Sequence, residues 1–339
     1  MVKIIDKSNL RQVILDFPKQ FVPGLKAAEN IFIKTPIDKI VICGMGGSAL
    51  AGALLKMILT HHPAQIGAKT PEIVIWRNYG LPANLGPNTL VIAVSYSGNT
   101  EETLSSYREA LNKGLKTISI ASDGKLEEMA RKNKTLFVKI PATGIPPRSA
   151  LGYIFGGLAR IFANLKFVSL KTVKDIEEAA EELNPARLEN QGKKLAKKIQ
   201  GKILLIYASE KWDELAHNWK IKFNENSKIP AFFNVFPELH HNEMNMLDPR
   251  QNLKNFHAVI IEDENENLRV GEGIKIFITF LKKQKVPAST VNLKGNNIFE
   301  KIFSNLLLAD WTTYWTGIFR GLDPAPTKII EEFKKQMAS

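Results

Sequence analysis

A turn rich in hydroxyl groups follows a short apolar segment near the middle of the N-terminal half. Residues 91–94 (Val-Ile-Ala-Val) run directly into Ser-Tyr-Ser-Gly-Asn-Thr at 95–100, and two glutamates then begin a predicted helix. A strand-to-helix turn presents unpaired backbone N–H groups at the positive end of the helix dipole, and Ser95, Ser97 and Thr100 add hydroxyl groups. The turn therefore suits a phosphate monoester, although taken alone it fits an ordinary helix cap equally well.

A second turn of related design makes the phosphate interpretation stronger. Residues 39–43 (Lys-Ile-Val-Ile-Cys) predict a buried strand, which continues into Gly-Met-Gly-Gly-Ser at 44–48 and a helical segment from 49. Because the carboxyl ends of parallel strands meet at one edge of a sheet, the two turns can line a single site.

The rest of the chain supplies the elements that must position these turns. Apolar strands alternate with amphipathic helices, which predicts an α/β protein with two doubly wound, mostly parallel sheets. We place one domain at 1–160 and the other at 161–339. The expected strands lie at 39–43, 72–76, 89–94, 116–120, 136–140, 202–207, 258–261 and 289–293.

The second half lacks the hydroxyl-rich turns of the first. Its corresponding segments read Ala208-Ser209-Glu210 and Glu262-Asp263-Glu264. Because a carboxylate cluster repels phosphate, we expect one phosphate site per chain, in the first domain.

The segment most suited to acid–base chemistry lies in the second half. Glu225 stands in Asn-Glu-Asn-Ser-Lys, and His240-His241-Asn242-Glu243 follows after an apolar stretch. Moving a proton between two sugar carbons needs a base such as a carboxylate, and ring opening suits a histidine. The plain alternatives are a glutamate on a helix surface and a histidine that caps a helix. Adjacent histidines point apart on most backbones, so we expect no metal site at His240, His241 and Glu243.

The motifs G-M-G-G-S and S-Y-S-G-N-T-E-E-T resemble the sugar isomerase (SIS) domain. Over essentially its whole length the chain resembles the bifunctional phosphoglucose/phosphomannose isomerase family. This resemblance implies that Glu225 is the catalytic base and that His241 opens the sugar ring. It also implies that Arg148, in P-P-R-S-A-L-G-Y, is an active-site arginine, although an arginine after two prolines can equally lie on a surface.

The resemblance assigns further substrate contacts. Lys334, in the final helix, would assist at the ring oxygen, and Thr327 would help to accept the mannose epimer; helix phase alone does not separate Lys334 from Lys335. The phosphate would be held by the Gly47 backbone and four side chains. These are Ser48, Ser95, Ser97 and Thr100.

Two positions depart from the family pattern. Ala325 stands where threonine is more frequent, and His240 stands where asparagine is more frequent. Neither departure removes a proposed catalytic group.

The activity that the resemblance implies is the interconversion of glucose 6-phosphate with fructose 6-phosphate through a cis-enediol, extended to mannose 6-phosphate. It implies no metal or redox cofactor, and a homodimer whose site is completed by a histidine of the neighbouring subunit. The epimer preference depends on the space around C2, which the sequence does not reveal.

Four alternative functions remain to be weighed. A non-catalytic sugar-phosphate sensor would keep the turn at 95–100 but could lose Glu225, His241 and Arg148 together, and all three are present. An aminating isomerase would need a glutaminase domain as its ammonia source. An N-acetylmuramate-phosphate lyase or a pentose-phosphate isomerase does not match the second half of the chain.

Composition and residue patterns also predict the partners and the location of the protein. The net charge of +12 is spread over helical faces without a nucleic-acid-binding motif, so we expect no nucleic-acid partner. No apolar run approaches a membrane span, and the first residues contain no signal-peptide core; we expect a cytoplasmic protein. We also expect residues 3–36 to form a helical arm over the first sheet, the single Cys43 to be a buried strand residue, and Trp311, Tyr314 and Trp315 to belong to the core or a dimer surface.

Overall fold

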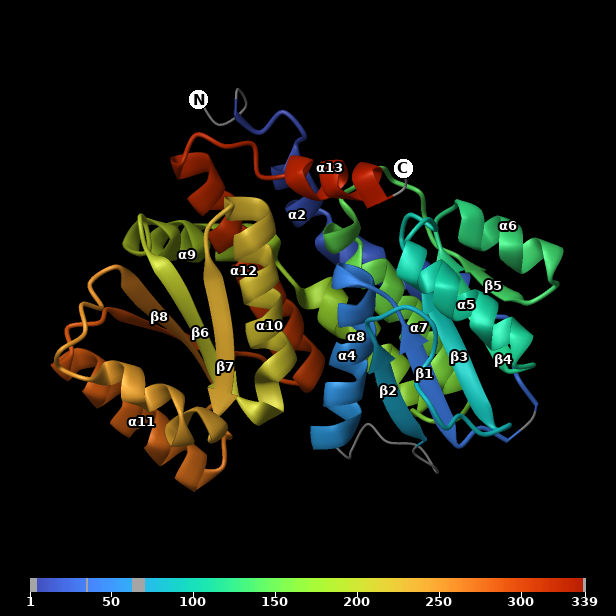
Figure 1. The fold of residues 1–339 in the computed structure, drawn as a ribbon, viewed down its shortest axis with the longest axis horizontal. Coiled ribbons are helices and arrows are strands. Elements are labelled where there is room, and N and C mark those ends of the chain that lie inside the picture. The colour runs from blue at the N-terminus through green and yellow to red at the C-terminus, as the bar shows by residue number, and fades with distance from the viewer. Residues whose placement is uncertain (1–4, 35, 63–70, 338–339) are drawn as a thin grey trace. The chain divides into compact units, whose positions relative to one another are not determined.

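The computed structural model describes residues 5–34, 36–62 and 71–337, and it divides into two compact units (Figure 1). The first-sheet unit contains Asp16–Leu183 with Asn297–Phe299. The second-sheet unit contains Met1–Leu15, Asn184–Asn296 and Glu300–Ser339. The expected domain boundary after residue 160 falls within helix α7 (Leu151–Asn164). Residues 1–4, where the signal-peptide expectation begins, lie outside the described residues.

The first sheet is five-stranded and parallel. Its order is β2-β1-β3-β4-β5. The strands are β1 (Lys39–Cys43), β2 (Glu72–Trp76), β3 (Thr89–Val94), β4 (Lys116–Ala121) and β5 (Leu136–Lys139). The central strands β1 and β3 are almost completely buried, as is usual for a parallel sheet with helices on both faces, and this burial explains why their sequences are continuously apolar. The expected fold class is confirmed.

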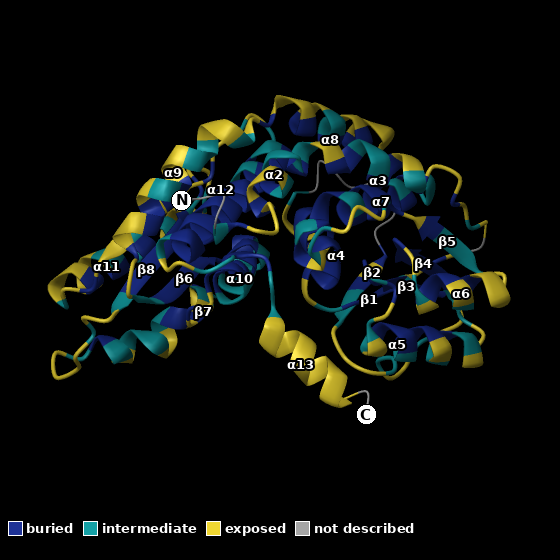
Figure 2. Ribbon diagram, turned by 90° about the horizontal axis from the view of Figure 1, so that it is seen from above, coloured by how far each residue is buried: buried dark blue, intermediate teal, exposed yellow. Residues whose placement is uncertain are grey.

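Helices cover this sheet on both sides (Figures 1 and 2). Helices α4 (Gly46–His61), α5 (Glu101–Asn112), α6 (Lys125–Lys132) and α7 (Leu151–Asn164) lie against the sheet, whereas α3 (Phe21–Ala27) and α8 (Leu170–Glu182) pack on α7. Cys43 is completely buried, and burial raises the pKa of its thiol to about 12. The expectation of a buried structural cysteine is therefore confirmed.

The N-terminal segment is shared between the two units. Residues from Asp16 onward belong to the first-sheet unit, where Gln20 donates to Ser149 O and accepts from Gly152 N. Helix α2 (Leu10–Leu15) belongs instead to the second-sheet unit, where Arg11 pairs with Glu189. The expectation of one arm over the first sheet is thus wrong for the residues before Asp16.

The second sheet repeats the strand order of the first. Its order is β7-β6-β8-β9, all parallel, which matches β2-β1-β3-β4. The strands are β6 (Ile203–Ser209), β7 (Ala231–Phe236), β8 (Phe256–Glu262) and β9 (Ala288–Asn292). The sequence analysis did not predict β7. Its sequence, Ala-Phe-Phe-Asn-Val-Phe, is apolar but lacks a clear alternation, and in the structure Phe232 and Phe233 are exposed on this edge strand.

Five longer helices belong to the second-sheet unit. They are α9 (Pro185–Lys198), α10 (Asp213–Lys222), α11 (Leu268–Lys283), α12 (Ile298–Phe319) and α13 (Lys328–Met337), except that the first two residues of α12 fall in the first-sheet unit. The rings of Trp311, Tyr314 and Trp315 on α12 are buried in successive edge-to-face contacts, as expected for core residues. No helix in the ranges that the structure describes has the length and apolar character needed to cross a membrane.

The packing of α3 on α7 gives a test of the fold. A Cβ atom at Gly24 would lie 2.2 Å from the carbonyl oxygen of Tyr153, whereas one at Gly271, inside α11, would meet nothing within 4 Å. We expect Gly24→Ala to lower the free energy of unfolding by about 1–3 kcal/mol, because the helices must separate. Gly271→Ala should leave it unchanged or raise it by up to about 1 kcal/mol. Urea denaturation measures both, and equal effects would contradict the described packing.

Candidate functional site

Helices α4 and α5 begin at the carboxyl edge of the first sheet without a side-chain cap. Their preceding residues, Met45 and Thr100, make no side-chain hydrogen bond to the first backbone N–H groups. By contrast, α8, α9 and α11 are capped by Ser169, Asn184 and Asn267. Helix α4 has no acidic residue in its first turn, so its start retains positive potential that suits an anion. Helix α5 begins with Glu101 and Glu102, so its start offers an anion backbone N–H groups rather than an uncompensated charge.

One hydrogen bond joins the two predicted turns, and another closes the second turn on itself. The backbone N–H of Tyr96 donates to Ser48 Oγ at 3.2 Å, and Ser95 Oγ lies 2.8 Å from Thr100 Oγ1. Ser48 and Ser95 are both buried, whereas Ser97 and Thr100 are half-buried. The structure therefore brings these predicted phosphate contacts to one edge of the first sheet.

A third loop holds the turn at 95–100 in place. Gly98 has a φ of +66°, and a Cβ atom there would lie only 1.7 Å from the carbonyl oxygen of Asp123. Ser122 Oγ donates to Tyr96 O at 2.6 Å, and Asn99 Oδ1 accepts from the backbone N–H of Lys125. Sequence reasoning missed Ser122, although it directly follows β4, the neighbouring strand in the sheet, and this position was a usable signal.

Arg148 is buried beside the glycine turn. It lies in the 3-10 turn Pro147–Ser149 that precedes α7, and it is only 5% exposed. A Cβ atom at Gly47 would lie 2.8 Å from Arg148 Cα, so the close approach requires glycine at that position. The alternative of a surface arginine does not hold.

Glu225 lies in a π-helical turn, Phe223–Ser227, that continues α10. Such turns occur frequently at functional sites. Its neighbours are anchored: Asn226 Nδ2 donates to Thr313 Oγ1 at 2.9 Å, and Ser227 Oγ donates to Thr313 O at 2.8 Å. Lys228 then turns the chain with a φ of +53° and donates to the carbonyl oxygens of Glu225 and Pro324. The half-buried Glu225 is therefore held on a rigid backbone.

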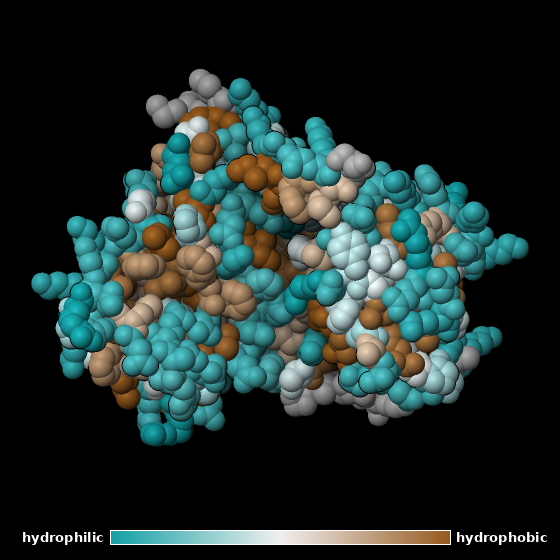
Figure 3. Space-filling model, viewed as in Figure 1, coloured by the Kyte–Doolittle hydropathy of each residue, from teal (hydrophilic) through white to brown (hydrophobic). Residues whose placement is uncertain are grey.

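The contact between Lys228 and Pro324 links this turn to the segment that leads into α13. Thr327 immediately precedes α13, and its hydroxyl lies 3.4 Å from Glu331 Oε1. Lys334 and Lys335 are both exposed, because no residue of α13 is buried (Figure 2). Figure 3 shows apolar side chains gathered over this helix, and three of its members, Ile329, Ile330 and Phe333, are large and exposed.

The two adjacent histidines have different environments. His241 is exposed at the end of the 3-10 turn Glu238–His241. The ring of His240 packs instead against Phe236 and Gly273, and burial lowers its pKa. No group of three metal-ligating side chains is placed to hold an ion in the described part of the chain.

Glu243 fixes the segment that follows His241. Tyr207 OH donates to Glu243 Oε1 at 2.6 Å, and Asn234 Nδ2 donates to Glu243 Oε2 at 2.5 Å. Both donors come from neighbouring strands, β6 and β7. Sequence analysis considered Glu243 only as a metal ligand and missed this anchoring.

The predicted residues thus form two groups in different compact units. Gly47, Ser48, Ser95, Ser97, Thr100 and Arg148 belong to the first-sheet unit. Glu225, His241, Thr327 and Lys334 belong to the second-sheet unit.

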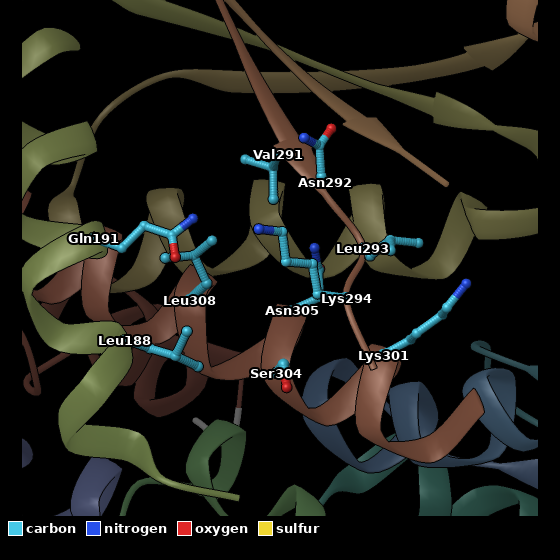
Figure 4. Close-up of a pocket in the computed structure, with 10 residues that line it drawn as sticks. All are labelled: Leu188, Gln191, Val291, Asn292, Leu293, Lys294, Lys301, Ser304, Asn305 and Leu308. Carbon is cyan, nitrogen blue, oxygen red and sulfur yellow. The ribbon is translucent and has the colours of Figure 1, made fainter. Parts of the chain in front are cut away.

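A small pocket within the second-sheet unit contains none of these residues (Figure 4). It lies at the end of β9 between α9 and α12, and its volume is about 60 Å³. Small-molecule sites usually begin near ~300 Å³, so we do not assign the substrate to it. It is lined by Leu188, Gln191, Val291, Asn292, Leu293, Lys294, Lys301, Ser304, Asn305 and Leu308.

Comparison with known families covers both units. Residues 35–145 match the family model of the SIS domain. Residues 188–337 match that of the bacterial phospho-glucose isomerase C-terminal SIS domain.

Two relatives and one solved structure illustrate the similarity. A bifunctional phosphoglucose/phosphomannose isomerase of Caldicellulosiruptor bescii is 35% identical over 338 residues, which cover 96% of this chain and 98% of that protein. A D-glucosamine-6-phosphate 4-epimerase of Sulfolobus acidocaldarius is 34% identical over 244 residues, 72% of each chain. The C-terminal domain of glucosamine-fructose-6-phosphate aminotransferase from Francisella tularensis has a TM-score of 0.72 over 93% of this chain and 97% of that domain; at 15% identity it shows the shared fold alone.

The packing of Gly98 predicts that replacing this glycine weakens substrate binding at the turn 95–100. Gly98 and Gly114 have similar φ angles, +66° and +64°, but only a Cβ atom at Gly98 would meet another backbone. Each alanine variant should lose about 1 kcal/mol of stability through left-handed strain. Gly98→Ala should lose about 1–3 kcal/mol more, because its Cβ atom would collide with the carbonyl oxygen of Asp123. Gly98→Ala should in addition weaken binding of glucose 6-phosphate at least about tenfold, because the turn must leave the loop at Asp123.

Isothermal titration with glucose 6-phosphate measures this binding, and thermal unfolding measures the shared strain. Equal affinity in Gly98→Ala and Gly114→Ala would contradict a phosphate site at this turn.

Proposed function

The chain belongs to the bifunctional phosphoglucose/phosphomannose isomerase family, and from this membership we propose that it interconverts glucose 6-phosphate and mannose 6-phosphate with fructose 6-phosphate. The observation that carries the proposal is the similarity to isomerases over nearly the whole chain, since it includes both units. The named relatives favour an enzyme over the non-catalytic sensor.

Phosphate binding is assigned to the first-sheet unit. The backbone of Gly47 and the side chains of Ser48, Ser95, Ser97 and Thr100 would bind the phosphate at the uncapped starts of α4 and α5. The phosphate takes no part in the reaction. Its binding energy fixes the position of the distant carbons C1 and C2, which lowers the entropic part of the barrier.

Ring opening and proton transfer are assigned to the second-sheet unit. His241 and Lys334 would move the proton between the ring oxygen and the anomeric hydroxyl group. Glu225 would then take the proton from C2 of the open aldose and return it to C1, by way of a cis-enediol. Arg148 would stabilise the negative charge that develops on the enediolate oxygen.

The chemistry of the intermediate explains how one site could accept two epimers. Glucose 6-phosphate and mannose 6-phosphate differ only in configuration at C2, and C2 is planar in the enediol. Both substrates therefore pass through the same intermediate, and only the approach of the base to C2 differs. Thr327 is the residue that we assign to accommodating the mannose epimer.

A coupled assay of the EDTA-treated protein tests this function. Glucose 6-phosphate and mannose 6-phosphate are supplied separately, and fructose 6-phosphate is detected. We expect turnover of both, and we expect Glu225→Gln to lower kcat by about 10²–10⁴-fold because the amide cannot accept the proton. Glu210→Gln, at an exposed position after β6, is the matched control and should retain activity.

Each outcome of this assay is informative. Turnover of glucose 6-phosphate alone would remove the mannose specificity from the proposal. An unchanged kcat in Glu225→Gln would exclude Glu225 as the base. With D-glucosamine 6-phosphate supplied as a third substrate, its epimerisation in the absence of turnover of the other two sugars would favour the reaction named for the Sulfolobus relative.

We further propose a homodimer in which His241 acts in the site of the neighbouring subunit. Its support in this chain is the exposure of His241 and of Phe232 and Phe233 on the edge strand β7. Glu225→Gln and His241→Ala variants should each be inactive. When they are unfolded and refolded together, about a quarter of the activity should return, because half of the dimers are mixed and each has one intact site.

The alternative assignment predicts a different result. If His241 acts within its own subunit, both sites of a mixed dimer carry one substitution. No activity above that of the separate variants would then return, and the proposed sharing would be wrong.

A further inference from the structure

The repeated topology gives each turn of the first sheet a counterpart in the second. Strand β8 pairs with β6 as β3 pairs with β1. Ser95 is the first residue after β3, and Asp263 is the first residue after β8. A helix begins shortly after each of them, α5 at Glu101 and α11 at Leu268. Asp263 therefore occupies the place where the first sheet carries its phosphate turn.

The Asp263 carboxylate lies between two ammonium groups. Its side chain is 1% exposed; Oδ1 lies 2.7 Å from Lys301 Nζ, and Oδ2 lies 3.2 Å from Lys211 Nζ. The backbone N–H of Asn265 also donates to Oδ1, at 3.2 Å. An internal oxyanion is thus bound by two cations and a loop N–H group, which are the donors that commonly bind phosphate.

The charge of this carboxylate is maintained despite its burial. Burial alone would raise the pKa of Asp263, but hydrogen bonds from Lys301, Asn265 and Lys211 outweigh that effect and lower it. The lysines come from elements far apart in the chain. Lys211 lies in the turn after β6, the counterpart of the glycine turn after β1, and Lys301 lies on α12.

Other donors that the first sheet leaves open are satisfied within the second. Asn267 Oδ1 accepts from the backbone N–H groups of Arg269 and Val270 and so caps α11, whereas Thr100 provides no such cap for α5. Ser209 Oγ, at the end of β6, donates to Glu266. Protein side chains therefore occupy the helix end and the strand end at this edge.

The ammonium group of Lys301 does not point into the adjacent pocket. Lys301 lines it, but Figure 4 shows the Lys301 ammonium group pointing away from Leu188 and Gln191 on the opposite wall. The ammonium group reaches Asp263 instead.

We infer that the second sheet retains a binding site for a phosphate-like oxyanion, formed by Lys211 and Lys301, and that the carboxylate of Asp263 occupies it. Asp263 takes the place of an external anion rather than simply repelling one. This occupancy restricts phosphate binding to the first sheet. The inference rests on the second-sheet unit alone and does not depend on the isomerase activity.

Removal of the internal anion tests the inference. Asp263→Ser, which restores the residue found at position 95, should leave Lys211 and Lys301 without their counter-charge and lower the Tm. Added inorganic phosphate or sulfate should then raise the Tm by at least about 3 °C more than it does in the unsubstituted protein, at constant ionic strength in chloride. The Tm shift of the unsubstituted protein measures the contribution of anion binding at the first sheet.

Two variants separate a specific site from general screening. In Asp263→Ser with Lys211→Ala, one of the two cations is gone, and the additional shift should disappear. Asp310→Ser removes the carboxylate from another buried lysine, since Asp310 Oδ1 lies 2.5 Å from Lys222 Nζ between α10 and α12. It should show no additional shift, because that pair does not lie at the end of a strand.

The opposite results would overturn the inference. An equal phosphate shift in Asp263→Ser and the unsubstituted protein, or the same additional shift in Asp310→Ser, would show that no oxyanion site exists at Lys211 and Lys301. If Asp263→Ser does not fold, Asp263→Asn keeps the side-chain shape and removes the charge. The same comparison of shifts then decides.

Discussion

The starts of α4 and α5 have no side-chain cap, so their first backbone N–H groups can bind an anion, and much of the first-sheet unit is arranged around these two helix starts. A parallel sheet brings helix N-termini to one edge, and each exposes backbone N–H groups. The turns that leave these N–H groups accessible pass very close to the backbone of neighbouring segments. Gly98 therefore packs against Asp123, and Gly47 packs against Arg148, where any larger residue would collide. The proposed phosphate site and the position of the buried arginine depend on the same packing.

The two units use one topology for different purposes. In the first, small residues leave the sheet edge open to an external anion. In the second, Asp263 and Asn267 occupy the corresponding positions, and the side chains suited to acid–base chemistry lie elsewhere, on the π turn after α10 and on the segment fixed by Glu243. A duplicated fold can thus provide one anion site and one proton-transfer segment without competition between them.

Much of this arrangement could be predicted from the sequence, since buried parallel strands are continuously apolar. Strand β7 was not predicted although its sequence is apolar, because a short apolar run without alternation does not by itself distinguish a strand from a helix. Motifs and a family resemblance identified the candidate residues. They did not identify the contacts that hold those residues in place. The contact of Ser122 with Tyr96, the burial of Arg148 and the anchoring of Glu243 join segments distant in the chain, and no local pattern encodes such contacts.

The most direct test of the account is a crystal structure of the Glu225→Gln variant with bound fructose 6-phosphate. The account predicts one phosphate per chain, bound by Ser48, Ser95 and Thr100 at the starts of α4 and α5. It also predicts that C1 and C2 lie within hydrogen-bonding reach of the residue 225 side chain and of a His241. A phosphate bound at the second sheet, or a sugar whose C1 and C2 face away from residue 225, would contradict it.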